Sequence, residues 1–139
     1  MRVALFATCL GEHFFADACA DAVRLLRHLG VRVDFPSAQT CCGQPAYNAG
    51  HAREARRMAE HTLGVFEGFD YVVLPSGSCA GMIRCFYPEI LGRGDGGPPG
   101  DGPTGRTGRT RQRAEALAER TYELAHFLVT VLEIGRAHV

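Results

Sequence analysis

Three short apolar runs along the chain predict β-strands. Residues 3–8 (VALFAT) and 71–76 (YVVLPS) are almost continuously apolar, a pattern typical of strands that are buried on both faces. In residues 31–35 (VRVDF), apolar and charged side chains alternate, which predicts a strand with one face toward water. We therefore place residues 31–35 at the edge of a sheet.

Between and after these runs, apolar residues recur at the spacing of amphipathic helices. One such segment covers residues 13–29, with Gly30 as a natural C-terminal stop, and a second covers residues 52–66. A third helix is predicted over residues 111–132, and its apolar residues share one face: Leu117, Leu124, Leu128 and Val131. We also expect Ser78 to cap the helix that follows the third strand.

This alternation of strands and helices predicts the fold class. It is typical of a parallel sheet with right-handed crossover connections. With residues 31–35 at the edge, the predicted strand order is 2-1-3, as in flavodoxin-like folds. We expect an α/β three-layer sandwich around a short parallel sheet, with a Gly/Pro-rich loop and a C-terminal helix.

The composition divides the chain into parts. Residues 92–110 hold eight glycines and three prolines, which predicts a disordered insertion. We expect residues 1–91 to form one domain, and residues 111–133 a helix that belongs to it or leads out of it. The end of the chain, EIGRAHV, does not continue the apolar period, and its back-translation matches the start of a common short-read sequencing adapter. We therefore expect residues 134–139 to be an artefactual tail on a truncated fragment.

Composition narrows the possible functions. The 139 residues suffice for one domain with a core, and no apolar stretch reaches the length of a membrane span. The N-terminus does not resemble a secretory signal, so we expect a cytoplasmic location. A formal net charge of zero gives no indication of binding to nucleic acid. Six cysteines in a reducing compartment indicate metal binding or redox chemistry rather than disulfides.

Four of the six cysteines lie in the segments that follow predicted strands. Cys9 follows the first strand, Cys41 and Cys42 follow the second, and Cys79 follows the third. In a parallel α/β sheet these loops all lie outside the carboxyl ends of the strands, where ligands bind. We therefore expect the four thiols to converge in one metal-type site.

The remaining two cysteines, Cys19 and Cys85, are expected to fill space, which is the commonest role of an unpaired cysteine. The residue types around the other four leave the bound group open. Thiolate-rich sites select zinc or iron–sulfur clusters, and Gly43 and Gly77 would let backbone N–H groups approach the sulfurs of a cluster. Structural zinc sites usually use Cys-x₂₋₄-Cys pairs, whereas the short pair here is the adjacent Cys41–Cys42.

Three motifs in order, ATCL, CCGQPAYN and PSGSCAGM, resemble the cysteine-rich (CCG) domain of iron–sulfur oxidoreductases. That family includes the B subunit of heterodisulfide reductase, the iron–sulfur subunit of glycolate oxidase and, with the strongest resemblance, the A subunits of lactate-utilization systems. The resemblance covers residues 1–91 and resumes at residues 120–132. It implies a cofactor, an iron–sulfur cluster of the 4Fe-4S type, with ligands from one set of residues: Cys9, Cys41, Cys42 and Cys79.

The same resemblance implies a role in oxidising L-lactate to pyruvate. It further implies two partner subunits, one of them a ferredoxin-like iron–sulfur protein. The general CCG pattern ends in Cys-x-x-Cys, but here Met82 stands in place of the last cysteine. In the lactate-utilization branch this is typical of the first of two repeats, and the second repeat is missing here. We expect Met82 to point toward the thiols.

Two other functions stay open, and no catalytic residue is assigned. The chain could be a cluster-free structural or docking repeat, which the incomplete motif at Met82 favours. It could also be a zinc-binding module of a related 2-hydroxy-acid oxidase or heterodisulfide reductase complex. The sequence contains no phosphate loop, dinucleotide fingerprint or Ser-His-Asp arrangement that would indicate another class of enzyme.

Overall fold

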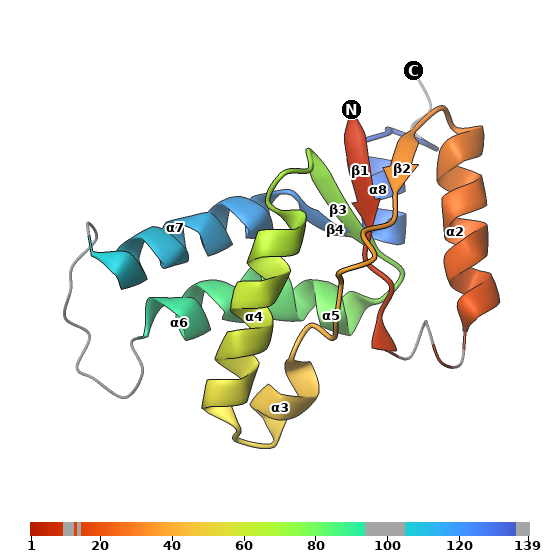
Figure 1. Cartoon of the computed structure of the whole chain (residues 1–139). Helices are drawn as coiled ribbons and strands as arrows, with labels where there is room; N and C mark the ends of the chain where they lie inside the picture. Colours follow the sequence, from red (N-terminus) through yellow and green to blue (C-terminus); the bar gives the residue numbers. More distant parts are fainter. Residues whose placement is uncertain (10–12, 14, 94–104, 136–139) are drawn as a thin grey trace.

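The computed structural model describes residues 1–9, 13, 15–93 and 105–135. Within these ranges the strands form one four-stranded parallel sheet in the order β2-β1-β3-β4 (Figure 1). The strands are β1 (Arg2–Leu5), β2 (Arg32–Asp34), β3 (Tyr71–Leu74) and β4 (Thr121–Glu123). The α/β class and the predicted 2-1-3 order of the first three strands are confirmed.

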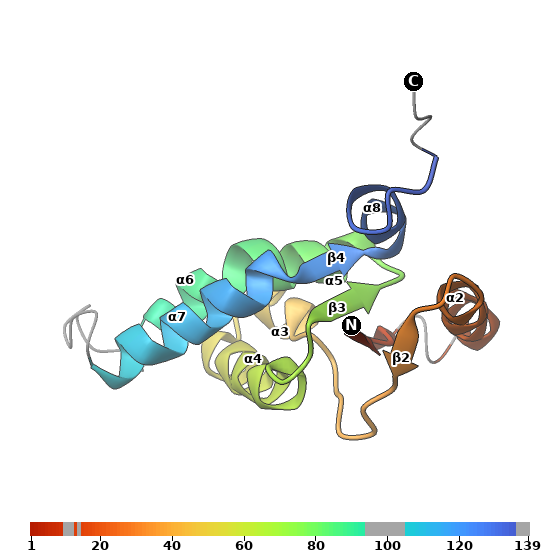
Figure 2. The ribbon, with the colours of Figure 1, turned by 90° about the horizontal axis from the view of Figure 1, so that it is seen from above.

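Helices cover both faces of this sheet, which gives the three predicted layers (Figure 2). On one face lie α2 (Ala16–His28) and α8 (Leu124–Thr130). The other face is covered by the remaining longer helices and by a helical run after β3: α4 (Ala52–Phe66), α5 (Gly77–Gly81), the π-helix η1 (Met82–Phe86), α6 (Tyr87–Gly92) and α7 (Arg106–Glu119). A short helix, α3 (Gln44–Asn48), precedes α4.

The strands divide their side chains between two hydrophobic cores, because successive residues of a strand point to opposite faces. Ala4 and Val72 belong to the first core, which is formed with α4, the run α5–η1–α6 and α7. Val3 and Val73 belong to the second core, which is formed with α2 and α8. All four of these side chains are fully buried, as the apolar runs predicted for β1 and β3.

The single C-terminal helix predicted over residues 111–132 is wrong. The chain forms α7, then β4, then α8. The backbone N–H of Val72 donates to the backbone oxygen of Arg120 at 2.9 Å. From Thr121 onward, β4 pairs with β3. Leu117 therefore packs in the first core and Leu124 against the second, so their shared helical spacing does not place them on one face.

The structure also differs from the predicted bounds of the insertion and from the predicted helix cap. Helix α7 begins at Arg106, so the helix extends into the predicted insertion, while residues 94–104 of that insertion lie outside the described residues. Residues 136–139 of the expected tail lie outside them too. The N-cap of α5 is Ser76 and not Ser78, since the extended backbone of Ser76 directs its hydroxyl to the backbone N–H of Cys79 at 3.5 Å.

In the described part of the chain, no helix combines the length and the apolar character that crossing a lipid bilayer requires.

A thiol-rich candidate metal centre

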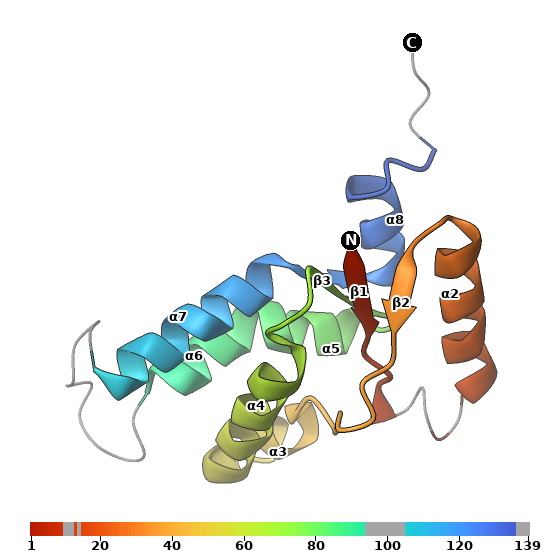
Figure 3. The same ribbon diagram turned by 45° about the horizontal axis from the view of Figure 1, so that its top comes forward.

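The three cysteine-bearing segments all follow the carboxyl ends of neighbouring parallel strands. Cys9 comes four residues after the end of β1, Cys41 and Cys42 lie between β2 and α3, and Cys79 lies in α5 directly after β3. The segment after β2 runs beside the end of β1 before it reaches α3 (Figure 1 and Figure 3). The fold therefore places these segments at one edge of the sheet, as the strand assignment predicted.

The four thiols meet there as two hydrogen-bonded pairs. Cys9 is joined to Cys41, and Cys42 is joined to Cys79. Electrostatic interactions also connect the two pairs, since Cys42 interacts with Cys41 and Cys9 interacts with Cys79. Each pair links two segments that are far apart in the sequence.

The pair of Cys42 and Cys79 consists of a thiol and a thiolate. The hydrogen bond that Cys42 donates lowers the pKa of Cys79 to about 6, and hydrogen bonds from Ser76 and Ser78 lower it further, against the effect of burial. The same hydrogen bond, together with burial, raises the pKa of Cys42. Cys79 is consequently ionised at neutral pH, and the thiolate is the form of cysteine that binds metals.

The pair of Cys9 and Cys41 has a different character. Burial, and a hydrogen bond to Cys41, raise the pKa of Cys9 to about 11, so Cys9 holds its proton at neutral pH. The backbone N–H of Gly43 lies 3.5 Å from the sulfur of Cys41 and donates to it. Binding a metal through all four sulfurs would therefore release protons from Cys9 and Cys42.

Gly43 is required by the shape of the turn that carries the adjacent cysteines. Its φ angle is +88°, in the left-handed region, and a Cβ atom there would lie 3.2 Å from the Cβ of Met58. The expected approach of a backbone N–H group to sulfur is thus observed at Gly43. Near Gly77, the second glycine in this expectation, a different hydrogen bond is formed. There the backbone N–H of Cys79 donates to the Ser76 hydroxyl.

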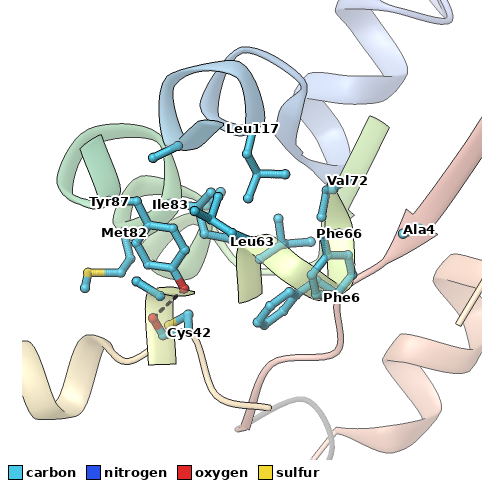
Figure 4. Close-up of a cluster of buried hydrophobic side chains, with 14 of the residues drawn as sticks. Ala4, Phe6, Cys42, Leu63, Phe66, Val72, Met82, Ile83, Tyr87 and Leu117 are labelled. Carbon is cyan, nitrogen blue, oxygen red and sulfur yellow. Dashed lines mark hydrogen bonds between the residues drawn. The ribbon is translucent and has the colours of Figure 1, made fainter. Parts of the chain in front are cut away.

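Cys42 and Met82 are built into the first core, each with only 1% of its surface exposed. Figure 4 shows both side chains in the cluster with Tyr87, whose hydroxyl donates to the backbone oxygen of Cys42 at 2.7 Å. Cys41 and Cys79 pack against this cluster. Met82 therefore fills core volume close to the thiols, and its orientation toward a bound group stays a prediction.

The four cysteines have the chemistry that a metal or cluster bound by thiolates requires. Four sulfur atoms, one of them already ionised, are the ligands that zinc and iron–sulfur clusters select. Among the described residues, however, no three His, Cys, Asp or Glu side chains are placed so that they could hold one metal ion. The thiols must exchange their hydrogen bonds for metal bonds, and their use as one ligand set stays a prediction.

The other two cysteines separate from this site. Cys19 is buried in the second core, on α2, as expected of a residue that fills space. The same expectation is wrong for Cys85, which is exposed on the π-helix η1.

The sequence alone did not identify Ser76 and Tyr87 as hydrogen-bond partners of the cysteines. Both serines of the motif PSGSC hydrogen-bond to Cys79, and only the backbone conformation selects Ser76 as the helix cap. Nothing local in the sequence relates Tyr87 to Cys42.

Comparison with known proteins agrees with the three motifs. Residues 3–84 match the family described as "Cysteine-rich domain" (CCG). "Lactate utilization protein A" of Geobacillus sp. (strain WCH70) is 46% identical over 96% of this chain and 50% of its own length. For "Lactate utilization protein A 2" of Bacillus cereus (strain Q1), the identity is 42% over 95% of this chain and 49% of the relative.

"Lactate utilization protein A" of Anoxybacillus flavithermus (strain DSM 21510 / WK1) is 43% identical over 96% of this chain and 50% of its own length. The chain thus spans about half the length of the curated relatives it matches. No solved structure matches the chain. The family match covers more than half of the residues and includes every strand-end cysteine, and the chain belongs to the cysteine-rich (CCG) domain family.

Proposed function

We propose that this chain carries iron–sulfur electron transfer in lactate utilization, within a complex that oxidises L-lactate to pyruvate. The relatives' names support the pathway. The observation that carries the electron-transfer role is the meeting of four thiols from three strand-end segments at one edge of the sheet. The partners in this proposal are two other lactate-utilization subunits, one of them a ferredoxin-like iron–sulfur protein.

Oxidation of L-lactate to pyruvate releases two electrons and two protons. A bound iron–sulfur cluster supplies one-electron transfer, with a potential that depends on hydrogen bonds to its sulfurs and on solvent exposure. In this proposal Cys9, Cys41, Cys42 and Cys79 hold the cluster. The N–H group of Gly43 supplies a hydrogen bond to the sulfur of Cys41, and the first core excludes water behind Cys42.

The chain's own residues determine how such a group binds. The lowered pKa of Cys79 favours its thiolate, which is the form of cysteine that binds metals. Cys9 and Cys42 hold their protons, so binding through them releases protons and becomes tighter as pH rises.

The test is to purify the chain anaerobically, reconstitute it with iron and sulfide, remove the excess and measure iron, sulfide and zinc per chain. Iron and sulfide in similar amounts, with broad visible absorbance, are the expected result. Zinc alone would replace the proposal with a zinc-binding module. A folded chain that retains neither metal would overturn it in favour of a cluster-free docking repeat.

A further inference from the structure

A glutamine side chain connects the first two cysteine-bearing segments. The backbone N–H of Ala7 donates to Gln39 Oε1 at 2.8 Å, and Gln39 Nε2 donates to the backbone oxygen of Leu5 at 3.3 Å. Ala7 precedes Cys9 by two residues, and Gln39 precedes Cys41 by two residues. The amide of Gln39 is therefore hydrogen-bonded to β1 and to the segment that leads from it to Cys9.

This contact replaces strand pairing where it has ended. The paired residues of β1 and β2 run only as far as Ala4 and Asp34. Beyond them the backbone of the second segment does not pair with β1, and the primary amide supplies one donor and one acceptor as a strand residue would. The contact thus fixes the separation between the segments that carry the Cys9 and Cys41 thiols.

A tyrosine connects the second and third segments in the same way. Tyr87 begins α6, in the helical run that starts with the Cys79 helix, and its hydroxyl donates to the backbone oxygen of Cys42. The side chain is fully buried, and burial raises the pKa of Tyr87, so the hydroxyl keeps the proton that it donates. A hydrogen bond in such surroundings is costly to break, because the carbonyl group is left without water or another donor.

We propose that Gln39 and Tyr87 are positioning residues, each responsible for one thiol pair. Gln39 sets the Cys9–Cys41 pair and Tyr87 sets the Cys42–Cys79 pair. The pairing itself is a property of the metal-free chain, and only its use for a cluster rests on the proposed function. Each residue acts through backbone atoms, and its loss should affect one pair and leave the other intact.

The experiment measures each thiol pair separately in the metal-free, reduced chain. Dibromobimane bridges two nearby thiols, forming two S–C bonds and releasing two bromide ions, with the thiol protons passing to buffer. Peptide mapping then identifies the bridged pair. In Gln39→Met, bridging of Cys9 to Cys41 should fall about fivefold while bridging of Cys42 to Cys79 is unchanged, as expected for the loss of a hydrogen-bonded link.

In Tyr87→Phe the opposite pattern is expected, with about a fivefold fall for Cys42 to Cys79 alone. The matched controls are Gln112→Met, which changes an exposed residue of α7, and Tyr71→Phe, which changes a residue packed against the second core. Both controls should bridge like the parent chain. Circular dichroism during heating identifies a temperature at which all variants are folded, and bridging is measured there.

A general loosening would lower both bridges in both variants, and it would overturn the proposal. Unchanged bridging in both variants would overturn it as well. Should Tyr87→Phe not fold at any temperature, Gln39→Met and Gln39→Glu decide alone. The Glu variant keeps the acceptor for Ala7 but sets a carboxylate oxygen against the backbone oxygen of Leu5, so bridging of Cys9 to Cys41 should fall in it as well, with Cys42 to Cys79 unchanged.

Reconstitution of the same variants with iron and sulfide separates this inference from the proposed function. Selective bridging defects with no iron bound by any protein, the parent included, would refute the cluster and leave the positioning roles standing. Iron bound equally by the parent and both variants, with unchanged bridging, would refute the positioning roles and leave the cluster standing.

Discussion

The two faces of the sheet use a buried cysteine in different ways. Cys19 lies within α2, where it packs in the second core and lines an apolar pocket of about 250 Å³. Cys42 is packed into the first core just as firmly, yet its thiol donates to Cys79 and its backbone oxygen accepts from Tyr87. Burial is therefore a property that both cysteines share, and it does not distinguish a filler from a candidate ligand.

The distinction lies in where each residue stands along the chain. Cys19 lies in the first turn of a helix, and its side chain is packed in the second core. Cys42 occupies a turn after a strand, where the parallel sheet brings other strand-end segments to the same edge. A thiol at such an edge meets groups from distant parts of the sequence, and that is what makes chemistry possible there.

The sharpest test of this comparison exchanges each of the two cysteines for serine. We predict that Cys42→Ser abolishes retention of iron after anaerobic reconstitution, because a hydroxyl group is a poor replacement for a thiolate ligand of iron. Cys19→Ser is the matched control, and it should retain iron like the parent chain. Equal losses in both folded variants would show that buried cysteine as such, rather than its place in the fold, controls retention.

A second test uses the acidity of Cys79 in the metal-free chain. Alkylation of Cys79 by iodoacetamide should reach half its maximal rate near its pKa of about 6 and rise above that pH, since only the thiolate reacts. In Cys42→Ala the lowering hydrogen bond is lost, so the profile should move to higher pH and the rate near neutral pH should fall several-fold. Peptide mass spectrometry measures the rates.

The same measurement in Cys19→Ala gives the control, because that residue lies on the opposite face of the sheet. Its profile for Cys79 should match that of the parent chain. An identical profile in Cys42→Ala would mean that the thiol pair does not determine the acidity of Cys79.

A third, smaller effect is expected at Met82, which the first core holds close to the thiols. Met82→Cys supplies the thiolate that the general CCG pattern has at this position. We predict that this variant retains more iron than the parent after reconstitution. Met58→Cys is the control, since Met58 lies on α4 against Gly43, in the turn after Cys41 and Cys42. This control should retain iron like the parent chain. If Met82→Cys and the parent, both folded, hold equal iron, then Met82 lies outside the site.

The smallest predicted effect concerns β4, where the chain passes from the first core to the second. The hydroxyl of Thr121 is buried and donates to the backbone oxygen of Leu117 at 2.7 Å. Thr121→Val should lower the free energy of unfolding by about 1 kcal/mol, as measured by urea denaturation. In Thr110→Val an exposed bond of the same kind to Arg106 is lost, and the change should stay within about 0.5 kcal/mol. Equal values for the two variants would show that the bond does not hold β4.

Much of the fold could be predicted because it depends on local patterns. The apolar runs identified β1 and β3, the alternation in residues 31–35 identified the edge strand β2, and the helical period of α4 gave the bounds that the structure has. The parallel arrangement follows from the alternation of strands and helices. The parallel arrangement was also enough to predict that four cysteines lie at one edge of the sheet, because strand direction alone determines where strand-end loops lie.

The sequence by itself thus determined the α/β class, the order of the first three strands and the edge that carries the cysteines. Only the tertiary structure decided that residues 121–123 form a strand within an apparently helical period, that the thiols meet as two pairs, and that Ser76 is the cap. Local periodicity records which side of an element is buried. Contacts such as that of Tyr87 with Cys42, 45 residues apart, depend on how whole elements pack, and no short window of sequence contains that information.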